Sequence, residues 1–261
     1  MPEFKSWRSY WDFERAVKQH MRYVRVSDTE KILASVRETA GKRAEAIPVE
    51  RFLWRAQLGH AWEPFCQDGE YVDDVPTPYP PERMKPLKDR AVEGRANPKG
   101  IPYLYLSTNR ETALAEVRPW IGSLVSVGQF KTLRDLRLVN CTSDQKGSRV
   151  YLGGEPSPEK CEEAVWVDID RAFARPITPS DDLADYVPTQ ILAELFKANG
   201  FDGVAYRSSL GAGHNVVLFG LGDVEIVNCF LWEARSVTFE FAEAANPYYL
   251  MKHDGTRESI A

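Results

Sequence analysis

Three polar side chains stand out because each lies where the surrounding residues predict buried or tightly turned backbone. Arg55 interrupts the apolar run FLWRAQL at 52–58, Glu116 borders the apolar face of a predicted helix, and Ser208 begins the glycine-containing segment SSLGAGHN. A buried arginine needs either a carboxylate partner or an anionic ligand. A glutamate at a helix end is either solvated or, when placed beside a cleft, available for chemistry.

Two neighbouring segments bear on the same question. Arg95 lies in GRANPKG at 94–100, where the small residues allow close approach of a ligand, and the planar guanidinium fits a phosphate. The loop from Ser208 to Asn215 can offer hydroxyl and backbone N–H groups to a phosphate or a ribose. The same loop also reads as an ordinary β-hairpin turn, because serine and glycine favour turns.

The elements that position these residues follow from hydrophobic periodicity. The sequence predicts an amphipathic helix over 6–21 capped by Ser6, and a second helix from Ser27 or Asp28 to about Ala44. A buried strand then holds Arg55. The prolines between 60 and 93 exclude regular structure there and predict a long ordered loop.

The segment before Glu116 is the clearest local pattern. IPYLYLS at 101–107 predicts a strand, and Thr108 with Glu111 forms a capping box that starts a helix ended by Pro119. Further along, PTQILAELFKANG at 188–200 predicts a helix with Pro188 in its first turn and Gly200 at its C-cap. Additional strands are expected at 123–130, 135–141, 164–169, 201–209, 215–221, 224–230 and 236–242, with frayed residues from about 247.

Helices and strands do not alternate in a βαβ rhythm, so the expected class is α+β with a mixed or antiparallel sheet and not a doubly wound fold. The net charge of -5 argues against a nucleic-acid binder. No segment resembles a signal peptide or a membrane span, so we expect a cytoplasmic protein with no membrane contact. The four cysteines lack metal or disulfide spacing and are expected to be buried free thiols, and no metal site is expected among the histidines.

Three blocks together resemble the RES domain family, which is named for an arginine, a glutamate and a serine. They are WRA at 54–56, GRANPKGIPYLYLSTNRETALAEVRP at 94–119 and PTQILAELFKANGFDGVAYRSSLGAGHNVVLF at 188–219. The spacing from Arg95 through Tyr105 to Glu116, and from Ser208 to Asn215, fits the family. The resemblance covers roughly residues 50 to 235.

The resemblance implies a fold similar to ADP-ribosyltransferases, with a split mixed-sheet core, and the activity of bacterial toxins that degrade NAD. NAD would be the substrate, cleaved at the nicotinamide–ribose bond by phosphorolysis or hydrolysis, with inorganic phosphate as the second substrate in the first case and no cofactor required. A helix-turn-helix antitoxin would be the partner. The implied roles are phosphate binding for Arg55 and Arg95, packing beside nicotinamide for Tyr105, action at the nicotinamide ribose for Glu116, and pocket lining for Ser208 and Asn215.

The implied catalytic set is therefore Arg55, Tyr105, Glu116 and Ser208. Cleavage of a glycosidic C–N bond passes through an oxocarbenium-like transition state, which a carboxylate stabilises. Two other functions stay open: transfer of ADP-ribose to a macromolecule, and a silent module that binds a nucleotide without turnover. Ser209 competes with Ser208 for the serine role.

This chain also departs from the compact members of the family. We expect a helical N-terminal extension at 1–49, a RES domain at 50–245 with a proline-rich insertion at about 60–93, and a C-terminal tail at 246–261. The additions would cover the cleft, build a homodimer or replace the usual antitoxin contact.

Overall fold

The computed structural model describes residues 3–87, 90–143, 151–175, 183–238, 240–241, 249–251 and 257–259. The helices are α1 (Ser9–Gln19), α2 (Ser27–Ala40), α3 (Arg110–Glu116), α4 (Pro158–Ala174) and α5 (Val187–Ala198), with short 3₁₀ helices η1 (Gly41–Arg43), η2 (Pro81–Met84) and η3 (Leu183–Tyr186).

Twelve strands accompany them in the described residues. They are β1 (Ala44–Ile47), β2 (Phe52–Leu58), β3 (Ala61–Gln67), β4 (Glu70–Thr77), β5 (Leu104–Ser107), β6 (Leu124–Thr132), β7 (Leu136–Asn140), β8 (Gly203–Arg207), β9 (His214–Leu218), β10 (Val224–Glu233), β11 (Tyr249–Met251) and β12 (Arg257–Ser259).

Eight strands form one mixed sheet in the order β1-β7-β8-β9-β5-β2-β6-β10. The β7–β8 pair is parallel, and the other pairs in this sheet are antiparallel. The expected α+β class with a mixed sheet is confirmed. The segment 1–49 contributes β1 to one edge of this sheet, besides its two helices.

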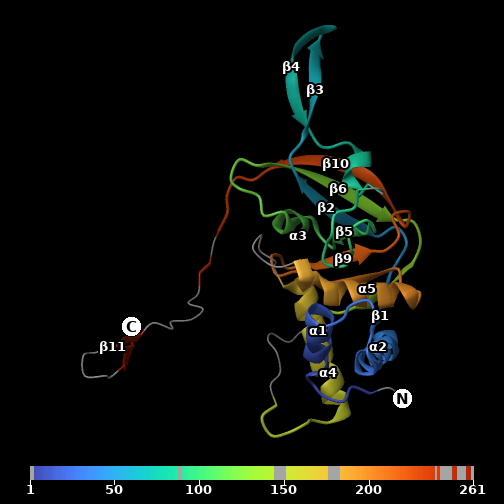
Figure 1. Cartoon of the computed structure of the whole chain (residues 1–261). Coiled ribbons are helices and arrows are strands. Elements are labelled where there is room, and N and C mark those ends of the chain that lie inside the picture. The colour runs from blue at the N-terminus through green and yellow to red at the C-terminus, as the bar shows by residue number, and fades with distance from the viewer. Residues whose placement is uncertain are drawn as a thin grey trace.

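The sheet is split in its middle. β2 and β5 share a single register pair, Trp54 with Ser107, whereas β2 follows β6 over its full length from Phe52 to Leu58. Beyond Trp54 the two strands diverge, so the sheet behaves as two halves joined at one point. Figure 1 shows β2, β6 and β10 turned away from β5 and β9.

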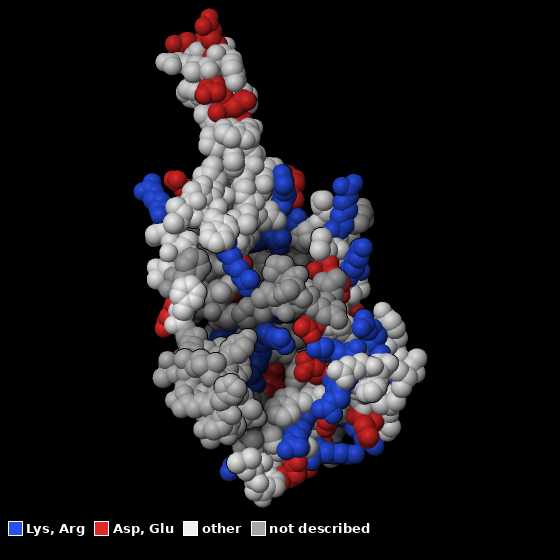
Figure 2. Space-filling model, turned by 60° about the vertical axis from the view of Figure 1, so that its left-hand side comes forward, with Lys and Arg blue, Asp and Glu red and all other residues white. Residues whose placement is uncertain are grey.

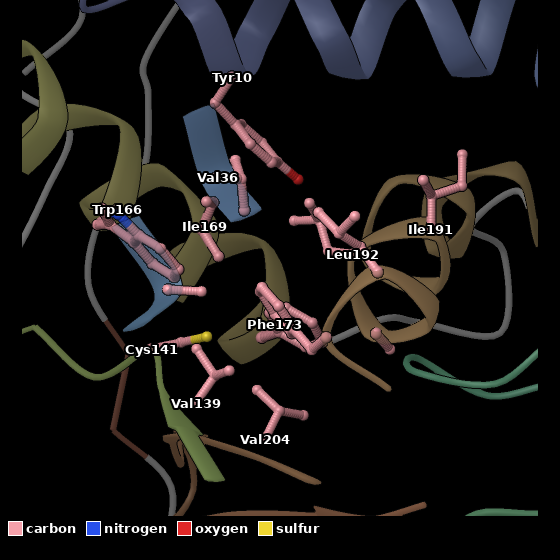
Figure 3. Packing of buried hydrophobic residues seen from close by; sticks show 14 of the residues in the cluster. Tyr10, Val36, Val139, Cys141, Trp166, Ile169, Phe173, Ile191, Leu192 and Val204 are labelled. Carbon is pink, nitrogen blue, oxygen red and sulfur yellow. The ribbon is translucent and has the colours of Figure 1, made fainter. Parts of the chain in front are cut away.

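Helices α1, α4 and α5 pack on one side of the β7-β8-β9 half (Figure 1). The core on this side is strongly aromatic and includes the buried rings of Trp166 and Phe173. Figure 3 shows these rings between helices α4 and α5 and the sheet residues Val139 and Val204. Phe13 and Val17 of α1 are buried in the same cluster as Trp7, so the N-terminal helices belong to this core.

The proline-rich segment 60–93 was expected to lack regular structure, and this expectation is wrong. β3 and β4 form a two-stranded hairpin that projects from the body of the molecule (Figure 1). Its two-residue turn is Asp68–Gly69, with φ angles of 53° and 87°. Positive φ at both positions is what a type I′ hairpin turn requires, and Asp-Gly is a strong signal for it. Pro64 and Pro76 fit because both strands are edges.

The strand expected at 164–169 is also wrong, because these residues lie inside α4. The run AVWVDI is buried on nearly every side, so it lacks the polar face by which a helix is recognised. A short apolar run cannot be assigned from periodicity alone. The strand expected at 236–242 is absent from 236–238 and 240–241, while 239 and 242 lie outside the described residues.

Two predicted helix caps differ from the structure. Asn109, and not Thr108, caps α3, with its Oδ1 accepting a hydrogen bond from the N–H of Thr112 at 2.8 Å. Ser6 does not cap α1, which begins at Ser9; its hydroxyl donates to Glu155 at 2.8 Å. The cap of α5 is confirmed: Gly200 has a φ of 77° and donates to the carbonyl of Lys197.

The strands expected at 123–130, 135–141 and 224–230 are confirmed as β6, β7 and β10. All four cysteines are free. Cys141 and Cys161 are buried as expected, whereas Cys66 on β3 is exposed, which corrects the expectation for that thiol. Within the described residues, no helix has the length and apolar character needed to cross a membrane.

Candidate active site

Glu116 ends α3, and its carboxylate is held by residues from the far end of the chain. Oε1 accepts a hydrogen bond from the hydroxyl of Ser208 at 2.7 Å and another from Nδ2 of Asn215 at 2.7 Å. Ser208 and Asn215 are buried, and Glu116 is half-buried. The structure therefore brings together three of the residues that the sequence analysis singled out.

The two hydrogen bonds leave one carboxylate oxygen open. Both go to Oε1, and Oε2 of Glu116 has no hydrogen-bond partner among the described residues. A carboxylate held through one oxygen keeps a fixed orientation while the other oxygen faces a ligand. This arrangement differs from a solvated helix-end glutamate, which would have no such restraints.

Ser208 acts on Glu116 and is not a free hydroxyl. Its Oγ accepts hydrogen bonds from the backbone N–H groups of Leu210 at 3.1 Å and Gly211 at 3.0 Å, and it donates its only hydrogen to Glu116. A hydroxyl has one donor and two acceptor positions, and all three are used here. Ser208 therefore positions the carboxylate, and its hydroxyl has no unused hydrogen-bonding position.

Ser107 is a residue that the sequence analysis missed. Its hydroxyl donates to Oδ1 of Asn215 at 3.0 Å, which leaves Nδ2 of that amide to face Glu116. Ser107 and Asn215 are register partners on β5 and β9, so their side chains lie on the same face of the sheet. The signal for this contact is the strand register, which the sequence does not specify.

The loop between Ser208 and Asn215 is held against α3. Gly213 donates its N–H to the hydroxyl of Thr112 at 2.9 Å. A Cβ atom at Gly211 would lie 2.6 Å from the same hydroxyl oxygen. The glycine at 211 is thus required by close packing on the helix that carries Glu116.

Tyr206 links this cluster to Arg95. Tyr206 lies opposite Asn215 in the β8–β9 register, and the guanidinium of Arg95 lies 5.7 Å from the centre of its ring. Burial raises the pKa of Tyr206, the charge of Arg95 opposes that shift, and the carboxylate of Glu116 adds to it. Arg95 and Glu116 therefore lie close enough to act on one phenol.

Arg95 is held by two hydrogen bonds but keeps one unused donor. Its Nη2 donates to the carbonyl of Arg175 at 2.7 Å, and its backbone carbonyl accepts from Thr189 at 2.6 Å. Its Nε is buried and has no partner among the described residues. A buried N–H group without a partner is costly, and a bound anion would satisfy it.

Tyr105 is fastened through its hydroxyl, which donates to Oδ1 of Asn97 at 2.7 Å and accepts from the N–H of Ala96 at 2.9 Å. Burial raises the pKa of Tyr105. A Cβ atom at Gly94 would lie 2.6 Å from this hydroxyl oxygen and 2.7 Å from Oδ1 of Asn97. The small residue at 94 is therefore needed for the approach of Tyr105, and not only for that of a ligand.

Arg55 lies at the split of the sheet. Its Nη1 donates to the carbonyl oxygen of Tyr105 across the split at 3.4 Å, and its Nε is buried without a partner among the described residues. Burial lowers the pKa of Arg55. No carboxylate of the described chain forms an ion pair with it, so of the two interpretations of Arg55 the structural one, a carboxylate pair, does not hold.

Arg55 and Tyr105 line a cavity of about 520 Å³ that Glu116, Ser208 and Asn215 do not line. The predicted residues thus form two groups: the Glu116 cluster, to which Arg95 is joined through Tyr206, and the Arg55 cavity. Ser209 belongs to neither. It is exposed, and its hydroxyl donates to the carbonyl of Ala174 at 3.0 Å.

The described residues contain no group of three or more His, Cys, Asp or Glu side chains that could hold a metal ion. Glu116 is an oriented carboxylate, and the guanidinium of Arg95 lies on the other side of Tyr206.

The chain combines a split mixed sheet with a carboxylate, that of Glu116, which a serine and an asparagine hold in place. The family model of the RES domain matches residues 52–239, and the chain belongs to this family. The expected family is confirmed on more than half of the chain.

No curated protein matches the sequence. Among solved structures, the chain is similar to a chain of the M. tuberculosis MbcT–MbcA toxin–antitoxin complex, with 14% identity, 76% of this chain and 92% of that chain covered, and a TM-score of 0.43.

Proposed function

We propose that the protein cleaves NAD at the bond between nicotinamide and ribose, as an NAD phosphorylase or NAD glycohydrolase. The observation that carries this proposal is the carboxylate of Glu116, held through Oε1 by Ser208 and Asn215 with Oε2 unpartnered among the described residues. An oriented carboxylate of this kind can stabilise positive charge that develops on a sugar ring.

In the proposed reaction, the C–N bond breaks and its electron pair goes to the pyridine nitrogen, so nicotinamide leaves as a neutral molecule. The ribose carbon becomes oxocarbenium-like, and Oε2 of Glu116 faces this charge. Water or inorganic phosphate then forms the new C–O bond. When water attacks, it releases one proton to solvent; when phosphate attacks, the product is a 1″-phosphate ester. Because the leaving group is already cationic in NAD, no strong general acid is needed.

The remaining cations suit the pyrophosphate of NAD. Arg95 and Arg55 each keep a buried Nε without a partner among the described residues, and guanidinium groups bind phosphate oxygens well. Tyr105 lines the Arg55 cavity next to the same split of the sheet. No cofactor takes part in this scheme.

The proposal is tested by incubating the pure protein with NAD, with and without phosphate, and identifying the products by mass spectrometry. We expect free nicotinamide together with either ADP-ribose or its 1″-phosphate. No nicotinamide in either buffer would contradict the proposal, and saturable NAD binding without products would instead identify a nucleotide-sensing module.

A second candidate is transfer of ADP-ribose to a macromolecule, because a groove of about 1230 Å³ adjoins the site. Leu114 and Ala115 of α3 line it, as does Leu210, which follows Ser208 by two residues. A macromolecule in this groove would lie beside Glu116. Labelled NAD would then mark a protein or a nucleic acid instead of releasing only free product.

We also propose that the protein acts as a toxin restrained by a helix-turn-helix antitoxin. Expression without a partner should then arrest bacterial growth, and the variant Glu116→Gln should not. Growth arrest by both forms would separate toxicity from the proposed chemistry.

A further inference from the structure

The 520 Å³ cavity beside Arg55 lies in the split between β2 and β5. Its outer wall is the segment that follows the hairpin, which contributes Arg83, Lys85 and Arg90, with Glu82 as the one carboxylate of the lining. Three arginines, one lysine and one glutamate therefore line this cavity.

Within the described residues, Arg55, Arg83 and Arg90 form no ion pair, whereas Arg134 pairs with Asp202 and Asp223 elsewhere on the same chain. Like charges gathered around one cavity repel each other, and this repulsion is strongest where water is excluded. A bound anion would offset it.

The cations are also held in position before any ligand arrives. The guanidinium of Arg83 stacks on the ring of Tyr79 at 3.8 Å, and Arg55 donates across the sheet split to the carbonyl of Tyr105. Lys85 fastens the segment to the body, because its Nζ donates to the carbonyls of Leu221 at 3.0 Å and Val224 at 2.7 Å. Groups restrained in this way lose little freedom on binding.

We infer that this cavity binds a dianionic phosphate group, with Arg55, Arg83 and Arg90 as its ligands. The planar fork of a guanidinium matches two phosphate oxygens, and several such groups around one cavity favour a phosphate over a singly charged carboxylate. Arg55 lines the cavity, and its Nε is buried without a partner among the described residues, so this side chain has an unused donor.

Two sources of this group fit the cavity: inorganic phosphate, and a phosphate monoester carried by a dinucleotide, as in NADP. The choice between them rests on the proposed function. The binding of the group depends only on the cations that line the cavity. Figure 2 shows Lys and Arg side chains, interspersed with Asp and Glu, on the face below the acidic tip of the hairpin.

The first experiment measures binding of inorganic phosphate by isothermal titration calorimetry at constant ionic strength, since surface charge effects change with salt. We expect saturable binding to the wild type and a roughly tenfold weaker Kd for Arg83→Gln and for Arg90→Gln, since each removes one charged contact. Both side chains are exposed, so the variants should fold. Arg90→Lys, which keeps the charge, should recover part of the affinity.

Arg8→Gln is the matched control, because Arg8 is another exposed arginine that stacks on an aromatic ring, Trp7, at 4.8 Å, and it does not line the cavity. Its phosphate affinity should equal that of the wild type. Absence of saturable phosphate binding to the wild type, or equal affinity in all variants, would overturn the inference.

The second experiment distinguishes the source, in the Glu116→Gln background to prevent turnover. If the group belongs to a dinucleotide, NADP should bind about tenfold more tightly than NAD, and the ratio should fall to about one after Arg83→Gln. Equal affinities with intact phosphate binding would assign the cavity to inorganic phosphate. Nicotinamide release by the otherwise wild-type protein is measured separately, so failure of the proposed function does not alter either binding result.

Discussion

Ser208 donates its only hydroxyl hydrogen to Oε1 of Glu116, at 2.7 Å, across 92 residues of sequence. The contact joins the end of α3 to the loop after β8. It makes the serine a positioning residue for the carboxylate, and it gives the site properties that single substitutions can separate.

Glu116→Gln should lower nicotinamide release at least about 100-fold, because the amide cannot stabilise a developing positive charge as a carboxylate does. The amide oxygen can still accept from Ser208 and Asn215, so the fold should be kept. Product formation and thermal unfolding of the same sample give the two readouts. Near-wild-type turnover would remove Glu116 from the mechanism.

Ser208→Ala should reduce turnover by about tenfold or more and destabilise the loop, because the N–H groups of Leu210 and Gly211 lose their acceptor at a cost of about 1–3 kcal/mol. Ser209→Ala is the matched control. Ser209 is exposed and its hydroxyl donates to the carbonyl of Ala174, away from Glu116, so its removal should change the rate less than about twofold. Equal rate losses in the two variants would contradict the assignment.

Ser107→Ala should free the amide of Asn215 to rotate, and its oxygen would then face the carboxylate of Glu116 in part of the molecules. We expect kcat to fall roughly tenfold with little change in KM, because an interaction of about 1–1.5 kcal/mol at the reacting group is weakened. Ser107→Thr restores the hydroxyl and should recover activity. If it does not, the loss in the alanine variant has a packing cause.

Gly94→Ala should destabilise the protein by about 1–3 kcal/mol, because the added Cβ meets the hydroxyl of Tyr105 and the side chain of Asn97. The expected fall in Tm is roughly 2–4 °C per kcal/mol. Gly41→Ala is the control, since no atom lies within 4 Å of a Cβ built there. Equal unfolding temperatures for the two variants would show that Tyr105 yields without cost.

Cys66 should be the one thiol that reacts rapidly with a disulfide reagent in the folded protein. It is exposed on β3, whereas burial raises the pKa of Cys141, of Cys161 and of Cys229. A thiol reacts as its thiolate. The fast phase should correspond to about one equivalent and disappear in Cys66→Ser. A fast phase that persists would place the reactive thiol elsewhere.

The strand and the helix that precede and contain Glu116 could be predicted from the sequence, because an aromatic strand followed by a capped helix is a local pattern. The contact of Glu116 with Ser208 could be expected only from the family spacing. Ser107 and Tyr206 could not be foreseen, since their places beside Asn215 follow from the register of β5, β9 and β8. Register depends on pairing between distant segments, which periodicity within one segment does not encode.

The hairpin was missed for a different reason. The expectation rested on the six prolines between 60 and 93, but prolines are compatible with a hairpin whose two strands are both edges. Residues 164–169 were predicted as a strand and not as part of α4 because Trp166 and its neighbours are buried on all sides, so this stretch of the helix has no polar face. In both cases tertiary surroundings decide the element.

The hairpin also determines how net charge is distributed over the molecule. Between Ala61 and Thr77 there are five acidic residues and no basic one, and the acidic side chains gather at its tip (Figure 2). Since the whole chain has a formal charge of -5, this arm accounts for the entire excess and the rest of the chain is balanced. The protein therefore has a strong electric dipole moment along the hairpin. In low salt, it should orient with this arm toward any positively charged surface, and the effect should fade as the Debye length shrinks below about 10 Å.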